Sequence, residues 1–392
     1  MTSPDWAIYS SLLYGKDCGV MNPRKIDRTA TETVCPAFRD EAGVWHVRDF
    51  AGGRAVLRST DTVQDGLGVE TVAKLPAGFR RPVLYWDGPE HREYRRQTAR
   101  FFTPRRVDAE YRGLMRRIAD REIAVLRRAG RADLSELSFR LAVDVAKAVI
   151  GLTESRPGTA RRLARFFPEK LGQPGFTSPH GIYWAGRILY LWLAIYVNDV
   201  RPAVRQRARR RQDDLISHLL DEGVSKGEIL SECLTVAAAG MVTTREFICA
   251  AAWHLCTDDE LMSRYRTSDE PARFAILQEL ARLEPPIAAL RRRTTAPVGL
   301  PDGTAIPADA RVHVSVAAAN VDPGMVGDRP GLTFGDGPHK CPGAHLAIQE
   351  SDIFLTKLFA LDGVRMTRSP RVSFNEEFAT YALHGLTVAI GQ

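Results

Sequence analysis

The feature of this sequence that most constrains its fold is an apolar segment from about Lys226 to Cys256. Its centre, L-T-V-A-A-A-G-M-V-T-T at 234–244, carries no charged residue. A helix that is apolar nearly all round is stable in water only where other elements surround it. The segment therefore predicts a long helix in the core of a large protein, and a chain of 392 residues can bury such a core.

Most of the remaining chain also has a helical pattern, interrupted by glycine and proline. Further helices are expected at about 104–126, 136–151, 157–170, 181–210 and 271–283, and from near Cys341 to about Leu361. Short strands are expected at 44–50, 55–57, 303–307 and 311–316. The sequence thus predicts a mainly α fold with minor β, in a single domain over residues 1–392.

Composition narrows the class of protein. No run approaches about 18 uncharged apolar residues, so no membrane span is expected, and the first residues lack the order of a signal peptide. The six cysteines are sparse and form no C-x-x-C pair, which favours a reducing, cytoplasmic location over a disulfide framework.

The net charge of +7 raises the question of a nucleic-acid partner. Arginine is concentrated in helical stretches such as 201–211, without interleaved aromatic residues for base stacking. We therefore expect solvated helix faces and no nucleic acid, with an acidic protein partner as a further possibility.

The strongest chemical signal is F-G-D-G-P-H-K-C-P-G-A-H-L-A at 334–347. Its glycines allow sharp turns, and Cys341 precedes an apolar helix whose N-terminus favours thiolate, the form that binds iron. Taken alone, Cys341 could also be a small buried hydrophobic residue. His339, Cys341 and His345 could suggest zinc, although no fourth ligand is evident.

Three further motifs each have an ordinary explanation in isolation. His91 and Arg95 share a helix face, and two cationic donors there suit a carboxylate or phosphate. Glu279 and Arg282 also share a face, as many surface pairs do. In A-G-M-V-T-T at 239–244, two hydroxyls lie in an apolar helix and need hydrogen-bond partners.

Together these motifs resemble the cytochrome P-450 family of haem-thiolate monooxygenases, especially the soluble bacterial type. The family's cysteine-loop motif, F-G-x-G-x-H-x-C-x-G, is matched at every specified position. The resemblance implies a P-450 fold with a long central helix over haem b. It also implies that Cys341 is the axial ligand of the haem iron.

The resemblance further assigns residues around the haem. The cofactor-binding residues it implies are His91, Arg95, Arg292, His339, Phe334, Gly335, Ala239 and Gly240, with Arg291 and Arg293 as neighbours of Arg292. It implies a catalytic role for Thr243 and Thr244, and a structural role for the pair of Glu279 and Arg282. The substrate-lining residues it suggests are Leu84, Tyr85, Met241, Val242, Ile287, Leu290 and Tyr381.

The sequence departs from the family at two places. Val242 occupies the position of an acid that assists proton delivery to dioxygen, so protons are expected to come through Thr243 and ordered water, or from the substrate. The stretch before Phe334 is short, and Arg329 is a weak candidate for the arginine that usually joins the Glu279–Arg282 pair.

The function implied is oxidation of a small hydrophobic or aromatic molecule by dioxygen, in secondary metabolism. Electrons would come from a separate ferredoxin and ferredoxin reductase, because the chain has no nucleotide-binding G-x-G-x-x-G motif. Two alternatives stay open: oxidative radical coupling without oxygen insertion, and a non-catalytic haem sensor or carrier.

Overall fold

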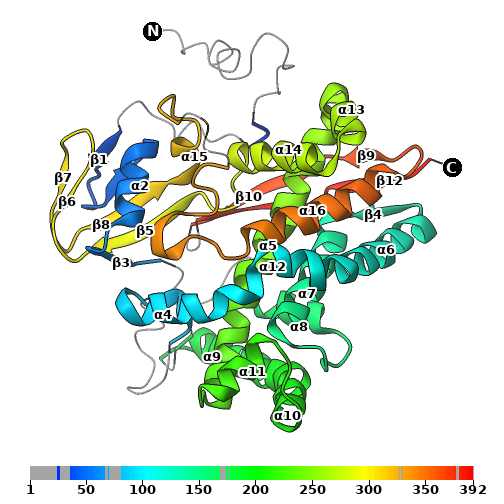
Figure 1. Ribbon diagram of the computed structural model, residues 1–392, viewed down its shortest axis with the longest axis horizontal. Helices are drawn as coiled ribbons and strands as arrows, with labels where there is room; N and C mark the ends of the chain where they lie inside the picture. The colour runs from blue at the N-terminus through cyan, green and yellow to red at the C-terminus, as the bar shows by residue number, and fades with distance from the viewer. Residues whose placement is uncertain are drawn as a thin grey trace.

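The structure is a computed structural model. It describes residues 24–26, 36–66, 69, 81–167, 174–175, 177–325, 327, 330–376 and 379–391. Figure 1 shows helices on one side of the molecule and most of the sheet structure on the other, with α12 passing between them.

Helix α12, Lys226–Thr257, forms the centre of the fold as predicted. Ser225 and Glu228 close its N-terminus as a capping box. The helix packs most extensively on α7 (Leu134–Ile150) and also contacts α14 (Glu270–Leu283) and α16 (Ala344–Phe359). It is long and apolar enough to cross a membrane by length and composition, but 56% of its most apolar window is buried by the protein. That burial is what a core helix requires.

The other helices largely follow the predicted ranges, with two of them divided. The range 104–126 contains α5 (Pro104–Arg106), a π-helical turn at Val107–Tyr111 and α6 (Arg112–Ala129). The range 181–210 contains α9 (Pro179–Ile195), a π-helical turn at Tyr196–Val200 and α10 (Arg201–Arg209). Further helices are α4 (Gly88–Thr98), α8 (Thr159–Phe166), α11 (Leu215–Asp221), α13 (Asp259–Thr267) and α15 (Val316–Ala319).

One strand prediction was wrong. Residues 55–57 belong to helix α2, Phe50–Arg58, whose N-cap Asp49 accepts a hydrogen bond from the Gly52 N–H. The cap stabilises the first turn, and burial of Val56 and Leu57 stabilises the helix as a whole. A three-residue apolar run is too short to distinguish a helix from a strand.

The largest sheet has the strand order β1-β2-β8-β5-β3. Its strands are β1 (Ala37–Arg39), β2 (Trp45–Val47), β8 (Arg311–Ser315), β5 (Ala289–Thr294) and β3 (Thr62–Gln64). The smaller sheets contain β4 (Arg131–Asp133), β6 (Val298–Gly299), β7 (Ala305–Ile306), β9 (Arg365–Arg368), β10 (Arg371–Asn375), β11 (Thr380–His384) and β12 (Thr387–Ala389). The fold is therefore mainly α with minor β, as predicted.

Helix α14 fixes the chain that leads to the cysteine loop. Arg282 forms a buried ion pair with Glu279 and also donates to the Asn320 carbonyl. The Asn320 side chain donates to the Arg282 carbonyl and to Thr333 Oγ1, and accepts from the Leu332 N–H. The ion pair of Glu279 and Arg282 therefore lies inside the protein. Asn320 connects it by hydrogen bonds to Leu332 and Thr333, just before Phe334. Arg329 lies outside the described residues.

Replacing Glu279 with alanine should remove both oxygens that accept hydrogen bonds from Arg282. The side chains of Glu279 and Arg282 are only 5% and 12% exposed, so the free energy of unfolding should fall by roughly 3–5 kcal/mol in urea denaturation. Glu93→Ala is the matched control, because it breaks an i,i+3 pair with Arg96 that is largely exposed and contributes little. Equal effects of the two substitutions would contradict the structural role.

Candidate cofactor site

The cysteine loop is shaped by close contact with helix α2. Gly335 and Gly337 have φ angles of +67° and +64°, a region that favours glycine. A Cβ on Gly337 would collide with the carbonyl oxygen of Leu57. The Cys341 N–H donates to the Phe334 carbonyl at 2.8 Å, which closes the loop. Helix α16 begins at Ala344, three residues after the predicted start at Cys341.

Cys341 is an exposed residue of the loop, although its thiol is surrounded by protein. Its pKa lies above the usual value, because the surrounding protein disfavours the charge more than the Gly343 N–H and the Arg95 guanidinium favour it. Proximity to the helix N-terminus is therefore not sufficient to hold a free thiolate. A metal ion bound to the sulfur would supply the missing stabilisation, because a coordinating thiol is deprotonated.

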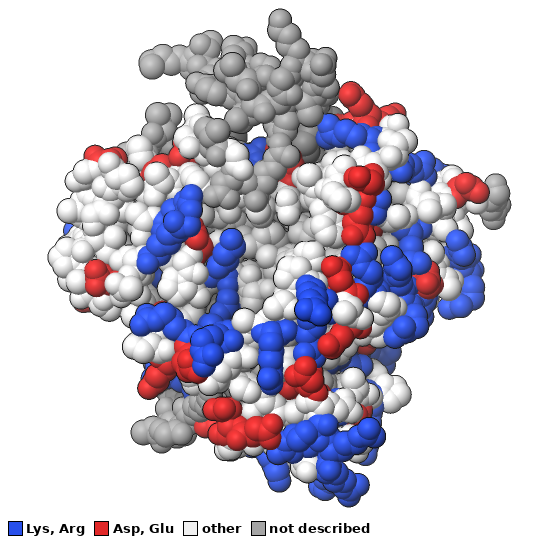
Figure 2. All heavy atoms as spheres, viewed as in Figure 1, with Lys and Arg blue, Asp and Glu red and all other residues white. Residues whose placement is uncertain are grey.

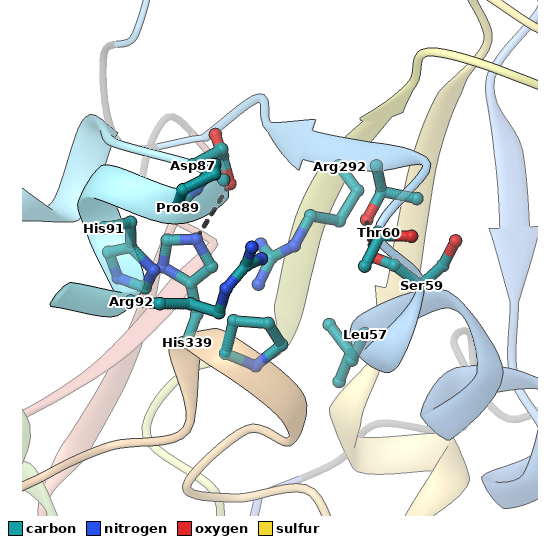
Figure 3. Close-up of a pocket in the computed structure, with 12 residues that line it drawn as sticks. Leu57, Ser59, Thr60, Asp87, Pro89, His91, Arg92, Arg292 and His339 are labelled. Atoms are coloured by element: carbon teal, nitrogen blue, oxygen red, sulfur yellow. Dashed lines mark hydrogen bonds and ion pairs between the residues drawn. The ribbon is translucent and has the colours of Figure 1, made fainter. Parts of the chain in front are cut away.

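Three side chains predicted to bind the same group come together from three elements (Figure 3). His91 lies on α4, Arg292 on β5 and His339 in the cysteine loop, and all three line one pocket of about 260 Å³. The rings of His91 and His339 stack with centroids 4.1 Å apart. Asp87 accepts a hydrogen bond from His339 Nε2 at 2.9 Å, which orients that ring. The predicted partner Arg95 instead donates to the Lys340 carbonyl.

Of the three consecutive arginines on β5, Arg292 is the one that lines the pocket. Arg292 is 4% exposed and lines the pocket, whereas Arg291 donates to the Glu376 carbonyl and Arg293 pairs with Asp309. Successive side chains on a strand point to opposite faces, so Arg292 points away from both neighbours.

Arg292 carries a buried positive charge that its protein neighbours do not neutralise directly. Burial lowers the pKa of Arg292 to about 10. No carboxylate in the described part of the chain lies within salt-bridge distance of it, and its side chain donates to Gln64 Oε1 and to the Arg291 carbonyl. Burial and the nearby charges of His339 and Arg95 lower the pKa of His91 to about 4, and His91 Nδ1 has no partner among the described residues. The pocket therefore suits an anionic group such as the propionates of a haem.

Gln64 is a pocket-edge residue that sequence reasoning missed. It pairs with Arg292 across strands β3 and β5, its Oε1 accepts from Arg292, and its Nε2 lies 3.3 Å from His339 Nδ1. Nothing in a lone glutamine indicates this position before the strand register is known.

Helix α12 presents an open face at its small residues. Ala239 and Gly240 are exposed, and a Cβ built on Gly240 meets nothing within 4 Å. Val242 and Thr243 are half-buried, and Thr243 Oγ1 donates to the Ala239 carbonyl at 2.7 Å. The open face has room for a flat cofactor, and the helix backbone holds the Thr243 hydroxyl beside it.

Thr244 points into the protein, toward an acid that the sequence motifs did not identify. Its hydroxyl hydrogen-bonds with Glu350 on α16, and the two residues are each 3% exposed. Burial raises the pKa of Glu350 to about 8, and its Oε2 has no partner among the described residues. Burial therefore favours the protonated form of Glu350. In the sequence Glu350 stands among other polar residues, Gln349, Ser351 and Asp352, so nothing in its neighbourhood distinguishes it.

The predicted substrate-lining residues fall into two groups. Leu84, Tyr85, Val242, Ile287 and Leu290 are half-buried. Met241 and Tyr381 are buried in hydrophobic core clusters, so these two residues do not line an open space for a substrate. Helical rotation explains Met241, which points away from the face that carries Gly240.

The comparisons with known proteins agree with this geometry. No model of a protein family matches the chain. The chain is 30% identical over 359 residues to the erythromycin C-12 hydroxylase of Saccharopolyspora erythraea, covering 84% of each. It is 28% identical over 340 residues to the cytochrome P450 monooxygenase PikC of Streptomyces venezuelae, covering 80% of this chain and 77% of that protein.

Solved structures show the same fold. P450BioI, crystallised in complex with an acyl carrier protein that carries hexadec-9Z-enoic acid, aligns with a TM-score of 0.75 at 21% identity, over 93% of this chain and 97% of that one. A mutant of P450 EryK in complex with erythromycin B aligns with a TM-score of 0.72 at 26% identity, over 95% and 98% of the two chains.

Three features together are typical of haem-thiolate proteins: a long helix with an open face, a cysteine loop, and a buried cationic pocket. This chain belongs to the cytochrome P450 family and is a monooxygenase of the bacterial type.

Replacing Arg292 with methionine should separate cofactor binding from stability. The apoprotein should unfold at the same or a higher temperature, because a buried charge is removed. Transfer of haem to apomyoglobin should speed up by about tenfold or more, because a charge-assisted hydrogen bond is lost.

Arg293→Met on the same strand is the control, because this arginine pairs with Asp309 outside the pocket. It should leave haem transfer unchanged. Haem transfer that is equally slow in Arg292→Met and in the unaltered protein would contradict the assignment of Arg292.

Proposed function

We propose that one domain spanning residues 1–392 binds haem b with Cys341 as the axial ligand of the iron. The observation that best supports this proposal is the buried charge of Arg292 in the pocket beside the cysteine loop. His91, His339 and Arg292 would hold the propionates, with Arg95 supporting the loop through the Lys340 carbonyl. Phe334 and Gly335 would lie on the cysteine side of the cofactor, and Ala239 and Gly240 on the other.

A haem bound in this way supplies the activation of dioxygen for oxidation of an organic substrate. The side chains of the protein would control how protons are delivered to that reaction. Val242 is unable to donate a proton, and the Thr243 hydroxyl is held against the Ala239 carbonyl. Burial next to Thr244 favours the protonated form of Glu350. We infer that protons reach the oxygen side through Thr243, ordered water and Thr244, with Glu350 or a polar group of the substrate as the source.

The proposed substrate is a small hydrophobic or aromatic molecule of secondary metabolism. Leu84, Tyr85, Val242 and Ile287 supply an apolar, partly aromatic lining. Two of the relatives are named as an erythromycin C-12 hydroxylase and a vitamin D(3) 25-hydroxylase.

The proposed electron donors are a ferredoxin and its reductase, in the cytoplasm. Figure 2 shows many Lys and Arg side chains on the face where α4, α6 and α16 lie, with Asp and Glu between them. Arg92, Arg96, Arg100 and Arg105 are exposed on or next to α4, the helix that carries His91. Exposed arginines near the cysteine loop favour docking of an acidic electron carrier.

The test is oxidation under labelled dioxygen. Haem-loaded protein with a ferredoxin and its reductase should consume NADH when a hydrophobic substrate from a panel of macrolides and sterols is added, and the product should contain one labelled oxygen atom. A product lacking label would instead support radical coupling, which the missing acid at Val242 makes the second candidate. Tight substrate binding without NADH consumption would support a sensor or carrier and contradict the proposed activity.

Replacing Glu350 with glutamine tests whether the buried acid is protonated. Burial raises the pKa of Glu350 in the folded protein to about 8, from an ordinary value of 4.5. As the pH rises from about 5 to 8, the unfolded state ionises while the folded state keeps its proton, so the wild type loses stability. The stability advantage of Glu350→Gln should therefore grow with pH, by up to about 1.4 kcal/mol per unit.

Infrared difference spectra of Glu350→Gln against wild type should show a protonated carboxyl band at pH 7 that disappears above about pH 9. Glu136→Gln, which removes an exposed acid on α7, is the control and should show neither effect. A stability difference that is independent of pH would mean that Glu350 is ionised and holds no proton for delivery.

A further inference from the structure

The short segment before α4 carries two of the proposed substrate-lining residues, Leu84 and Tyr85, in a 3-10 turn at Val83–Tyr85. Two local backbone hydrogen bonds form the turn. The Tyr85 N–H donates to the Pro82 carbonyl at 2.9 Å, and the Trp86 N–H donates to the Val83 carbonyl at 3.1 Å. A 3-10 turn of three residues is too short to fix its own position in the fold, so contacts with other elements determine where it lies.

Glu232 on α12 holds this segment directly. Its Oε2 accepts from the Val83 N–H at 3.0 Å, across 149 residues of sequence. Its Oε1 accepts from the Tyr94 hydroxyl on α4 at 3.0 Å. The carboxyl is 6% exposed, and the ring of Tyr94 lies 5.7 Å from that of Trp86. One buried carboxyl thus joins α12, the 3-10 turn and α4.

We propose that Glu232 is a positioning residue that fixes Leu84 and Tyr85 against the α12 wall of the substrate space. Glu232 lies two helical turns before Gly240, on the same helix as Val242 and Thr243. A displacement of the turn along α12 would therefore change the width of the space next to these residues. The proposal rests on the proposed function for the identity of that space.

The hydrogen bonds of Glu232 to Val83 and Tyr94 are strong, but they can break and form again. A buried carboxyl without its donors is costly, so the Val83 N–H and the Tyr94 hydroxyl are strongly preferred partners. Each bond is nevertheless a single hydrogen bond that opening of the turn would break. Loss of the contact should widen the range of accepted ligands and raise KM, while leaving kcat for a well-fitting substrate little changed.

Val83→Pro is the sharpest variant for this test. It removes one N–H and leaves Glu232 and Tyr94 intact, and proline is well tolerated at the first position of a helical turn. Glu232→Gln is the second variant, because an amide supplies one acceptor oxygen for two donors. Tyr94→Phe is the matched control, because it removes the other hydrogen bond and keeps the one to Val83.

The measurements are amide hydrogen exchange and ligand-binding rates on the haem-loaded protein. In Val83→Pro and Glu232→Gln, the amides of Tyr85 and Trp86 should exchange about tenfold faster. Association and dissociation of the probe 4-phenylimidazole, followed by its shift of the haem absorption band, should both accelerate. Tyr94→Phe should change the exchange of these two amides less than either variant.

Unchanged exchange and unchanged probe rates in both Val83→Pro and Glu232→Gln would overturn the proposal. The outcome is separable from that of the proposed function. Exchange of Tyr85 and Trp86 reports on the Glu232 contact in protein with or without haem. A wild-type protein that binds no haem would instead contradict the proposed function and leave the exchange result valid.

Discussion

The buried positive charge of Arg292 is the interaction on which the rest of the site depends. A guanidinium that is 4% exposed, with no carboxylate of the described residues at salt-bridge distance, is costly until an anion binds to it. The surrounding elements are arranged for that anion. Strand pairing brings Gln64 beside Arg292, the cysteine loop brings His339, and α4 brings His91. The same loop that places His339 ends at Cys341, so anion binding and metal binding are set by one segment.

The position of that segment depends on packing that is distant in sequence. Gly337 lies against the Leu57 carbonyl of α2, and Asp336 accepts from Arg54 and Arg58 of the same helix. On the other side, Asn320 connects the Arg282 carbonyl to Thr333. The start of the cysteine loop is thus held by hydrogen bonds on two sides, which keeps the thiol and the cationic pocket in a fixed relation.

The sequence predicted those features whose signal is local. An uncharged run indicated α12, and the spacing within the cysteine loop indicated the thiolate family. The prediction failed where contacts between distant segments determine the structure. Residues 55–57 belong to α2 and not to a strand, and Met241 lies in the core and not on the substrate side. The roles of Gln64, Glu232, Asn320 and Glu350 depend on partners far along the chain, and a single sequence carries no signal for those pairings. The acid missing at Val242 was visible in the sequence, whereas the buried acid beside Thr244 was not.

The most direct test of this account is the absorption spectrum of the reduced, carbon monoxide-bound protein, compared between the wild type and Cys341→Ser. The account predicts the red-shifted Soret band of thiolate ligation in the wild type, and its loss in Cys341→Ser with most of the helical circular dichroism retained. Cys256→Ser, at a half-buried cysteine on α12, serves as the control and should keep the band. A band that is unchanged in Cys341→Ser would mean that another residue binds the iron and would contradict the central claim.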